Sequence, residues 1–238
     1  MTDPSRPLPL QRQILTDSVY EAVRELVMNQ HIQPGARVNI DQLARDLNVS
    51  PTPIREALAR LEMDGLVIKE PLRGYSIAPL LDAAAFDQLF EVRLLLEPFA
   101  ARRACERGDL QLVRALRAEI DAMRKTLNRR RGETPLGYRE YRELARQDAR
   151  FHEHVVAASG NDLLRDTLVR LRAHLHLYRL YYTTGIGAET IAEHDKIVEG
   201  IAKGRPECAE RTMVDHIQRS RDRLAAGARD ASSAGLRR

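Results

Sequence analysis

The chain of 238 residues contains no tryptophan, few other aromatic residues and only two cysteines. Cys105 and Cys208 are too few for a disulfide-stabilised scaffold, so nothing in the sequence indicates an oxidising compartment. The N-terminal segment "MTDPSRPLPLQRQ" lacks the apolar region of a secretion signal. No run approaches the roughly 20 apolar residues that a membrane-spanning helix needs. We therefore expect a cytoplasmic protein with no membrane partner.

Helix-favouring residues are abundant instead. Ala, Leu, Arg and Glu are frequent, whereas runs of β-branched residues are scarce. Apolar residues make up 43% and charged residues 30% of the chain, which is the balance of a folded globular protein. The net charge of +4 is compatible with a nucleic-acid partner, but residues 1–80 hold nine Lys/Arg and ten Asp/Glu. A DNA-binding role must therefore depend on where the charges lie.

The pattern along the chain predicts a mainly α protein with two domains. Residues 12–80 read as three helices and a small β-hairpin, with helix starts at Thr16/Asp17, at "IDQLARDL" and after "NVS", and with strands "LVIKE" and "YSIAPL". Residues 81–226 read as an all-helical bundle, in which Asp82 and Asp109 begin helices and Gly108 ends one. Residues 1–11 and 227–238 are predicted to be flexible tails.

The second and third helices with their short turn form a helix-turn-helix pattern. Ser50 and Thr52 begin the third helix, where they either cap it or donate to a phosphate, and Pro53 fits its first turn. Arg55 is the candidate for a guanine contact. Further candidates for contact with phosphates are Arg45, Arg60, Lys69 and Arg73. Gly74 at the hairpin tip would let the hairpin approach either the DNA backbone or the minor groove. An ordinary amphipathic core helix is the alternative, and the following hairpin favours DNA binding.

A second set of candidate residues lies in the helical half. In "QDARFHEH", Asp148 and His152 are four residues apart and share one face of a helix, and two later helices carry His194 and His216. Three imidazoles and one carboxylate suit a divalent ion such as zinc. Because the chain has seven histidines, spacing alone does not separate a metal site from an accidental set.

The segment "PGARVNIDQLARDLNVSPTPIREALARLEMDGLVIKEPLRGYSI" resembles the winged helix-turn-helix of the GntR transcription regulators over residues 14–79. In that family the start of the recognition helix and the wing contact the operator. The resemblance implicates the matching positions here, which are Ser50, Thr52, Pro53, Arg55 and Gly74. Pro51 stands where many relatives have arginine, so we expect an operator sequence that differs from theirs.

Residues 82 to about 225 resemble the effector domain of the FadR subfamily, on "EVRLLLEPFAARRA", "DARFHEHVVAASGNDLL" and the two late His-containing helices. The resemblance implies a divalent metal, zinc with nickel or manganese as alternatives, bound by Asp148, His152, His194 and His216. It also implies a small carboxylate effector. Arg93 is the candidate clamp for that effector, and an Arg93–Glu97 ion pair is the alternative.

Together these features predict a ligand-responsive repressor. We expect it to act as a homodimer, because one small recognition helix reads too few base pairs for useful specificity. A metal-dependent enzyme acting on a small carboxylate is the alternative function. Such an enzyme needs a general base near the metal, and Glu153 is predicted to point away from the face of Asp148 and His152. We therefore do not expect catalysis.

Overall fold

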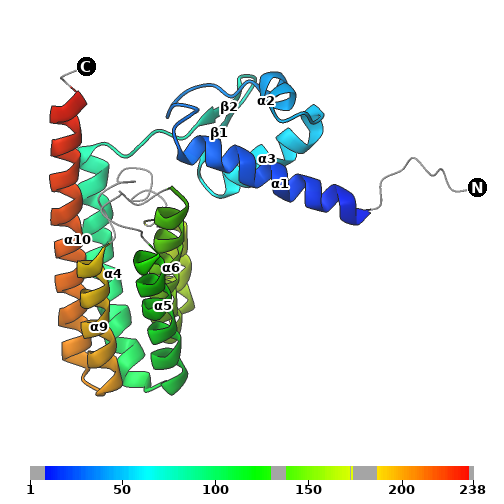
Figure 1. Cartoon of the computed structure of the whole chain (residues 1–238). Coiled ribbons are helices and arrows are strands. Elements are labelled where there is room, and N and C mark those ends of the chain that lie inside the picture. Colours follow the sequence, from blue (N-terminus) through cyan, green and yellow to red (C-terminus); the bar gives the residue numbers. More distant parts are fainter. Residues whose placement is uncertain (1–8, 130–137, 172, 174–186, 236–238) are drawn as a thin grey trace, which may run out of the picture. The chain divides into compact units, whose positions relative to one another are not determined.

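The computed structural model describes residues 9–129, 138–171, 173 and 187–235. The chain divides into two compact units, residues 1–80 and 81–238 (Figure 1). In the described residues the first unit has three helices and a two-stranded hairpin, and the second unit has helices alone. This arrangement confirms the fold class predicted from the sequence. Within the same residues, every helix is too short or too polar to cross a bilayer.

The first unit consists of α1 (Pro9–Met28), α2 (Ile40–Asp46), α3 (Pro51–Met63), β1 (Val67–Glu70) and β2 (Gly74–Ile77). Helix α3 packs against α1 and α2, and its fully buried side chains include Ile54, Leu58 and Leu61. These positions recur at the i, i+4, i+7 spacing of one helix face. Thr52, Arg55 and Ala59 occupy the opposite face and are exposed. One side of α3 therefore holds the core while the other side faces solvent.

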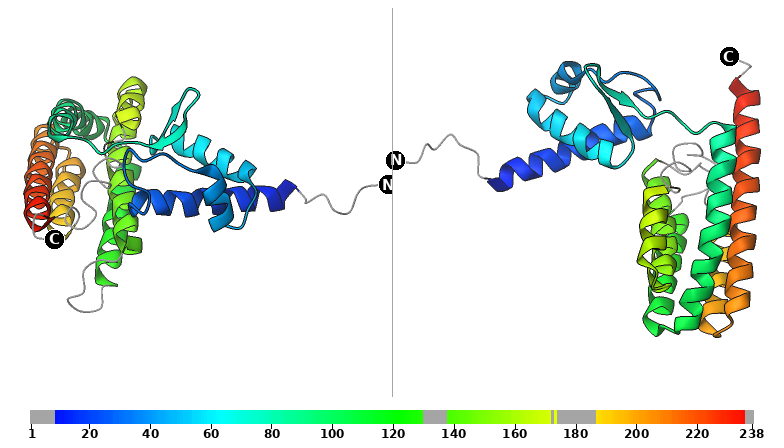
Figure 2. Two further views of the ribbon diagram at one scale, coloured as in Figure 1. Left: turned by 90° about the horizontal axis from the view of Figure 1, so that it is seen from above. Right: turned by 180° about the vertical axis from the view of Figure 1, so that it is seen from behind.

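The hairpin follows directly from α3. Strands β1 and β2 are antiparallel, in a register that pairs Val67 with Ile77 and Glu70 with Gly74. Val67 and Ile77 are buried, which fixes the register against the helices. In the left view of Figure 2 the hairpin projects away from the helices of its own unit. The predicted wing is therefore present and protrudes.

The second unit contains α4 (Ala83–Arg107), α5 (Leu110–Asn128), α6 (Tyr138–Ala158), α7 (Asp162–Leu171), α9 (Ala188–Ala202) and α10 (Pro206–Gly235). Helix α10 packs along α4 and α9, and α5 packs along α6 (Figure 1). The predicted boundaries between α4 and α5 are confirmed. Asp82 and Asp109 accept backbone N–H bonds of 2.8 Å at the two helix starts, and Gly108 ends α4 with a φ of 67°.

Two helix ends differ from the prediction. Helix α1 already begins at Pro9, so Thr16 is not its cap; the Thr16 hydroxyl instead donates to Glu56 Oε2 at 3.0 Å. Helix α10 continues to Gly235, nine residues beyond the predicted end at residue 226. Gly227 lies inside this helix, because a single glycine costs a helix only about 1 kcal/mol and does not end it. Residues 9–11 and 227–235, which were predicted to lie in the tails, are thus helical in the structure.

Candidate metal centre and nucleic-acid interface

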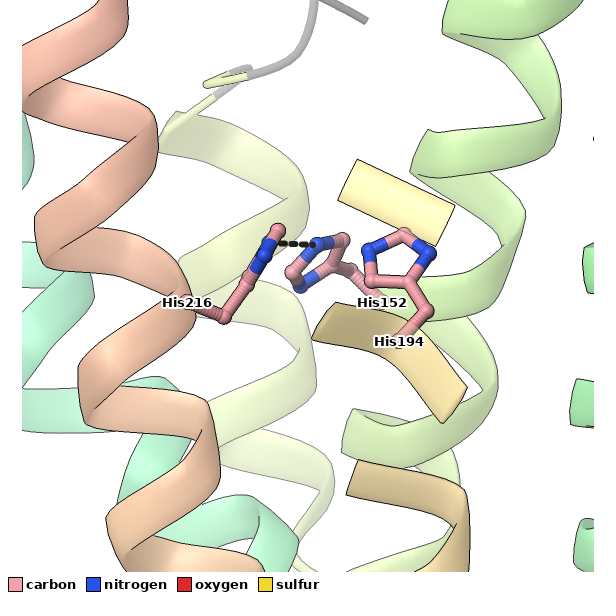
Figure 3. A group of neighbouring side chains, drawn as sticks. All are labelled: His152, His194 and His216. Carbon is pink, nitrogen blue, oxygen red and sulfur yellow. Dashed lines mark hydrogen bonds between the residues drawn. The ribbon is translucent and has the colours of Figure 1, made fainter. Parts of the chain in front are cut away.

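Three imidazole rings meet in the interior of the helical unit (Figure 3). His152 comes from α6, His194 from α9 and His216 from α10, and none is more than 3% exposed. The candidate ligand nitrogens of the three rings all lie within 4.8 Å of one another. Residues that are far apart in the sequence are thus brought to one point.

Asp148 lies one turn before His152 on α6, and its Oδ1 is 3.4 Å from Nε2 of His194. The ring of His194 also stacks on Phe151, with centroids 3.8 Å apart and planes 3° from parallel. The structure therefore brings together the three histidines predicted as ligands, and it places the fourth predicted ligand, Asp148, beside His194. Glu153, which follows His152, is exposed, so it does not supply a base to this centre.

A buried carboxylate supports the ring of His152. Glu97 Oε2 on α4 is 2.5 Å from His152 Nδ1, and Arg93 Nε donates to Glu97 Oε1 at 2.6 Å. Burial by itself would raise the pKa of Glu97, but the charges of Arg93 and His152 outweigh burial and hold that pKa well below its usual range. Glu97 is therefore an ionised acceptor for the imidazole.

His216 has a matching support. Its Nδ1 is 2.9 Å from Glu193 Oε2 on α9, and Arg223 donates to both oxygens of Glu193 at 2.7 and 2.9 Å. Burial again raises the pKa of Glu193, whereas hydrogen bonds from His216 and Arg223 outweigh it and lower the pKa to about 2. Sequence analysis missed Glu193 and Arg223. The one available signal was an acidic residue on the apolar side of "IAEHDKIVEGI".

The predicted effector clamp is not supported. Arg93 is 1% exposed and forms the ion pair with Glu97 that the alternative reading predicted, so a role in effector binding stays a prediction. Its guanidinium is already committed to a buried carboxylate, and releasing it for a ligand would leave that carboxylate unpaired. Arg93 therefore orients Glu97, and through it His152.

The chemistry of the donor set fits a metal ion. An ionised carboxylate at Nδ1 favours a proton on that nitrogen, so the neutral form of each ring, His152 or His216, offers its lone pair to a metal at Nε2. These two Nε2 atoms face each other at 3.2 Å. Two nitrogens bound to one tetrahedral Zn²⁺ ion lie about 3.3 Å apart, given Zn–N distances of roughly 2.0–2.1 Å. The spacing therefore matches that of two ligands of one cation.

The outward face of α3 holds the second candidate site. Thr52 and Arg55 are exposed there, next to the small side chain of Ala59. Ser50 is the N-cap residue, yet its side chain makes no capping hydrogen bond. Of the two roles considered for Ser50, side-chain capping is thus excluded. The backbone N–H groups of the first turn favour an anion at this helix end.

Two of the residues predicted to contact DNA have other contacts within the first unit. Pro53 is buried, because it lies on the core side of the first turn of α3, and Pro51 is the first residue of the helix instead. Arg60 pairs with Asp17 at 2.5 Å and lies over the ring of Tyr20, 4.2 Å from its centroid. Pro53 therefore belongs to the core, and Arg60 ties α3 to α1.

The remaining candidates are exposed. Arg45 on α2 donates a hydrogen bond to Gln42 Oε1 at 2.7 Å, and the Lys69 Nζ lies 5.9 Å from the ring centroid of Tyr75. Arg73 is 69% exposed in its side chain, with the Glu70 carboxylate 4.0 Å away. Gly74 has a φ of 86° and open space around its Cα, so the strand can approach another surface closely there.

Comparison with known proteins gives the family. Residues 15–77 match the gntR family of bacterial regulatory proteins, and residues 88–219 match the FCD domain. The chain belongs to the GntR family. Its sequence is 30% identical over 207 residues to the uncharacterized HTH-type transcriptional regulator YdhC of Bacillus subtilis, covering 86% of this chain and 88% of YdhC.

This GntR-family chain is also similar to a named repressor in sequence and to a solved structure in fold. It is 24% identical over 208 residues to the HTH-type transcriptional repressor RspR of Escherichia coli, covering 87% of each. The solved structure of E. coli McbR/YncC has the same fold, with a TM-score of 0.66 and 19% identity, covering 89% of this chain and 97% of that one. The protein is therefore a DNA-binding transcription regulator with an FCD domain, and not an enzyme.

Proposed function

We propose that this GntR-family protein is a cytoplasmic, homodimeric repressor whose FCD domain holds a divalent metal ion and binds a small carboxylate through it. The observation that carries the proposal is the pair of Nε2 atoms of His152 and His216, 3.2 Å apart in a buried site. With both Nδ1 atoms engaged by carboxylates, the two Nε2 atoms are directed at each other. A cation between two neutral rings would accept a lone pair from each of these nitrogens.

The ion would be held by His152, His194, His216 and Asp148. Three imidazoles with one carboxylate suit Zn²⁺, and they also suit Ni²⁺ or Mn²⁺, which accept more ligands. Glu97 and Glu193 fix the ring orientations, as carboxylates behind metal-binding histidines do. When bound, the metal supplies a positive centre to which an effector carboxylate can coordinate. The resemblance to the FadR subfamily supports this role.

The DNA-reading surface is proposed to be the outward face of α3 together with the hairpin. Arg55 would read a base in the major groove, and Ser50 and Thr52 would donate to phosphates at the helix start. Arg45, Lys69, Arg73 and Gly74 would lie along the backbone. One such helix reads few base pairs, which supports a homodimer on a pseudo-palindromic operator. Repression is supported by the name of the relative RspR.

An effector can change operator binding only if it binds one state of the protein more tightly than the other. A coupling of typical size would change operator affinity by roughly 5- to 150-fold. We expect the carboxylate to act only on metal-loaded protein, because the metal supplies its binding site.

A thermal-shift screen of the full chain against small carboxylates, with and without Zn²⁺, tests the proposal. Zn²⁺ is expected to raise the melting temperature, and one class of carboxylate is expected to raise it further only when Zn²⁺ is present. His216→Ala should lose both effects. His154→Ala is the matched control, because that side chain on α6 is 42% exposed. Equal responses of the two variants would contradict the metal assignment.

A further inference from the structure

The tip of the hairpin is a tight turn in which Leu72 has an unfavourable backbone conformation. The N–H of Arg73 donates to the carbonyl of Glu70 at 3.1 Å, which closes a four-residue turn over Pro71 and Leu72. Leu72, the third residue of this turn, has a φ of 61°. A positive φ at this position is ordinarily met by glycine or asparagine. A branched apolar side chain is strained there.

Leu72 is also fully exposed, at 108% of its reference area, so its side chain has no packing role within the described residues. Neither local conformation nor the core explains a leucine here. Strain and apolar exposure at one protruding position are the kind of outlier that points to function.

The neighbours of Leu72 indicate what covers it. Arg73 beside it is exposed, and Lys69 on β1 is exposed as well. The nearby Glu70 carboxylate accepts a hydrogen bond from Ser76 at 3.1 Å and lies 4.0 Å from Arg73, so it is engaged within the hairpin. An apolar tip flanked by cations matches a groove with phosphate walls and an apolar floor of sugars and bases.

We propose that Leu72 is a specificity-determining wedge, which enters the minor groove of the operator and reads how easily a base step there opens. Lys69 and Arg73 contact the phosphates on either side. Apolar side chains inserted at a base step unstack it and bend the duplex by roughly 20–90°. Pyrimidine–purine steps deform most easily, so the wedge favours them without any hydrogen bond to a base. This inference rests on the DNA binding proposed above.

The test compares Leu72→Asn with wild-type full chain on one DNA duplex, selected by the wild-type protein from a random-sequence pool. Asparagine accepts a positive φ, so the variant should fold and melt at the wild-type temperature or above it. Its affinity for the selected duplex should fall by about 10- to 100-fold, as for the loss of a buried leucine. The DNA bend, measured by energy transfer between end labels, should decrease.

Arg73→Ala is the matched control at the adjacent position. It should weaken binding to all sequences and reduce the salt dependence, whereas Leu72→Asn should leave the salt dependence unchanged and weaken the preference for pyrimidine–purine steps. Unchanged affinity, step preference and bend in Leu72→Asn would overturn the wedge, and so would a change in oligomeric state alone, which would assign Leu72 to a protein contact. Failure of the wild-type protein to select any duplex would instead refute the proposed DNA binding.

Discussion

Arg55 and Arg93 show how differently the two units use an arginine. Arg55 lies on the exposed side of α3, in a row with Thr52 and Ala59. Arg93 is 1% exposed and holds a buried glutamate 2.6 Å away. The first unit presents to solvent the side chains that are proposed to contact DNA. The second unit buries its candidate site, where Arg93 holds Glu97 and Glu97 holds the ring of His152.

The difference predicts how each region responds to substitution. An exposed side chain can be removed with little loss of stability, because few other atoms pack against it. Removing a charged side chain from a buried network lowers the stability strongly, because it leaves another charge buried without a partner. Four substitutions test this contrast.

The largest effect is expected for Arg93→Met. Glu97 would then be a buried carboxylate without its arginine, which costs roughly 3–5 kcal/mol of unfolding free energy. Urea unfolding of the metal-free chain, followed by helical circular dichroism, measures it. Arg103→Met is the control on the same helix, because the Arg103 side chain is 47% exposed and its pair with Glu106 is screened by solvent, so its loss should change stability little. Equal losses in the two variants would break the contrast.

Glu193→Gln is expected to act on the metal. A neutral amide orients the ring of His216 less firmly than a carboxylate does, so Zn²⁺ affinity should fall by about 10- to 100-fold. Competition with a chelator of known affinity measures the change. Glu189→Gln removes an exposed acid from the first turn of the same helix and should leave affinity unaltered. A similar loss of Zn²⁺ affinity in both variants would show that the effect comes from the net charge of the protein and not from the orientation of His216.

The candidate site could be predicted from the sequence only in part, and for a physical reason. Asp148, His152, His194 and His216 carry residue types and spacings that the family resemblance identifies. Their supports were missed or misread. The Arg93–Glu97 pair looks like an ordinary i, i+4 ion pair, and only burial shows that it orients a histidine. Glu193 and Arg223 lie 30 residues apart, and only the packing of α9 on α10 brings them together.

The fold of the first unit was predicted more completely, because its elements depend on local signals. The spacing of Ile54, Leu58 and Leu61 and the Pro34-Gly35 turn are visible in the sequence. The roles of the side chains at the start of α3 were harder to predict. Whether Ser50 caps and whether Pro53 is buried depend on the rotation of the first turn of α3 against the core, which the sequence pattern does not fix.

Arg55→Ala is expected to change recognition without changing stability. Loss of a bidentate base contact should cost about 1–3 kcal/mol of discrimination at one operator position, measured by binding to the selected duplex and its single-base variants. Arg60→Ala provides the comparison on the same helix. It should lower the melting temperature, because Asp17 and Tyr20 lose their partner, and it should keep the base preference. The reverse pattern would exchange the two assigned roles.

The smallest effect is expected for Lys69→Ala. Lys69 is exposed on the hairpin and is proposed to contact a phosphate. Removing one such contact should reduce the slope of log affinity against log salt by about 1, with equal weakening across sequences. Binding titrations at several salt concentrations measure the slope. A sequence-dependent loss would show that Lys69 reads bases.

The central claim is that the three enclosed imidazoles form a metal centre, and calorimetric titration of the chelator-treated full chain with Zn²⁺ tests it most directly. The wild-type chain is predicted to bind about one ion per chain, and a His194→Ala/His216→Ala variant is predicted to bind none at this site. The same stoichiometry and affinity in both proteins, or no binding by the wild-type chain, would contradict the account.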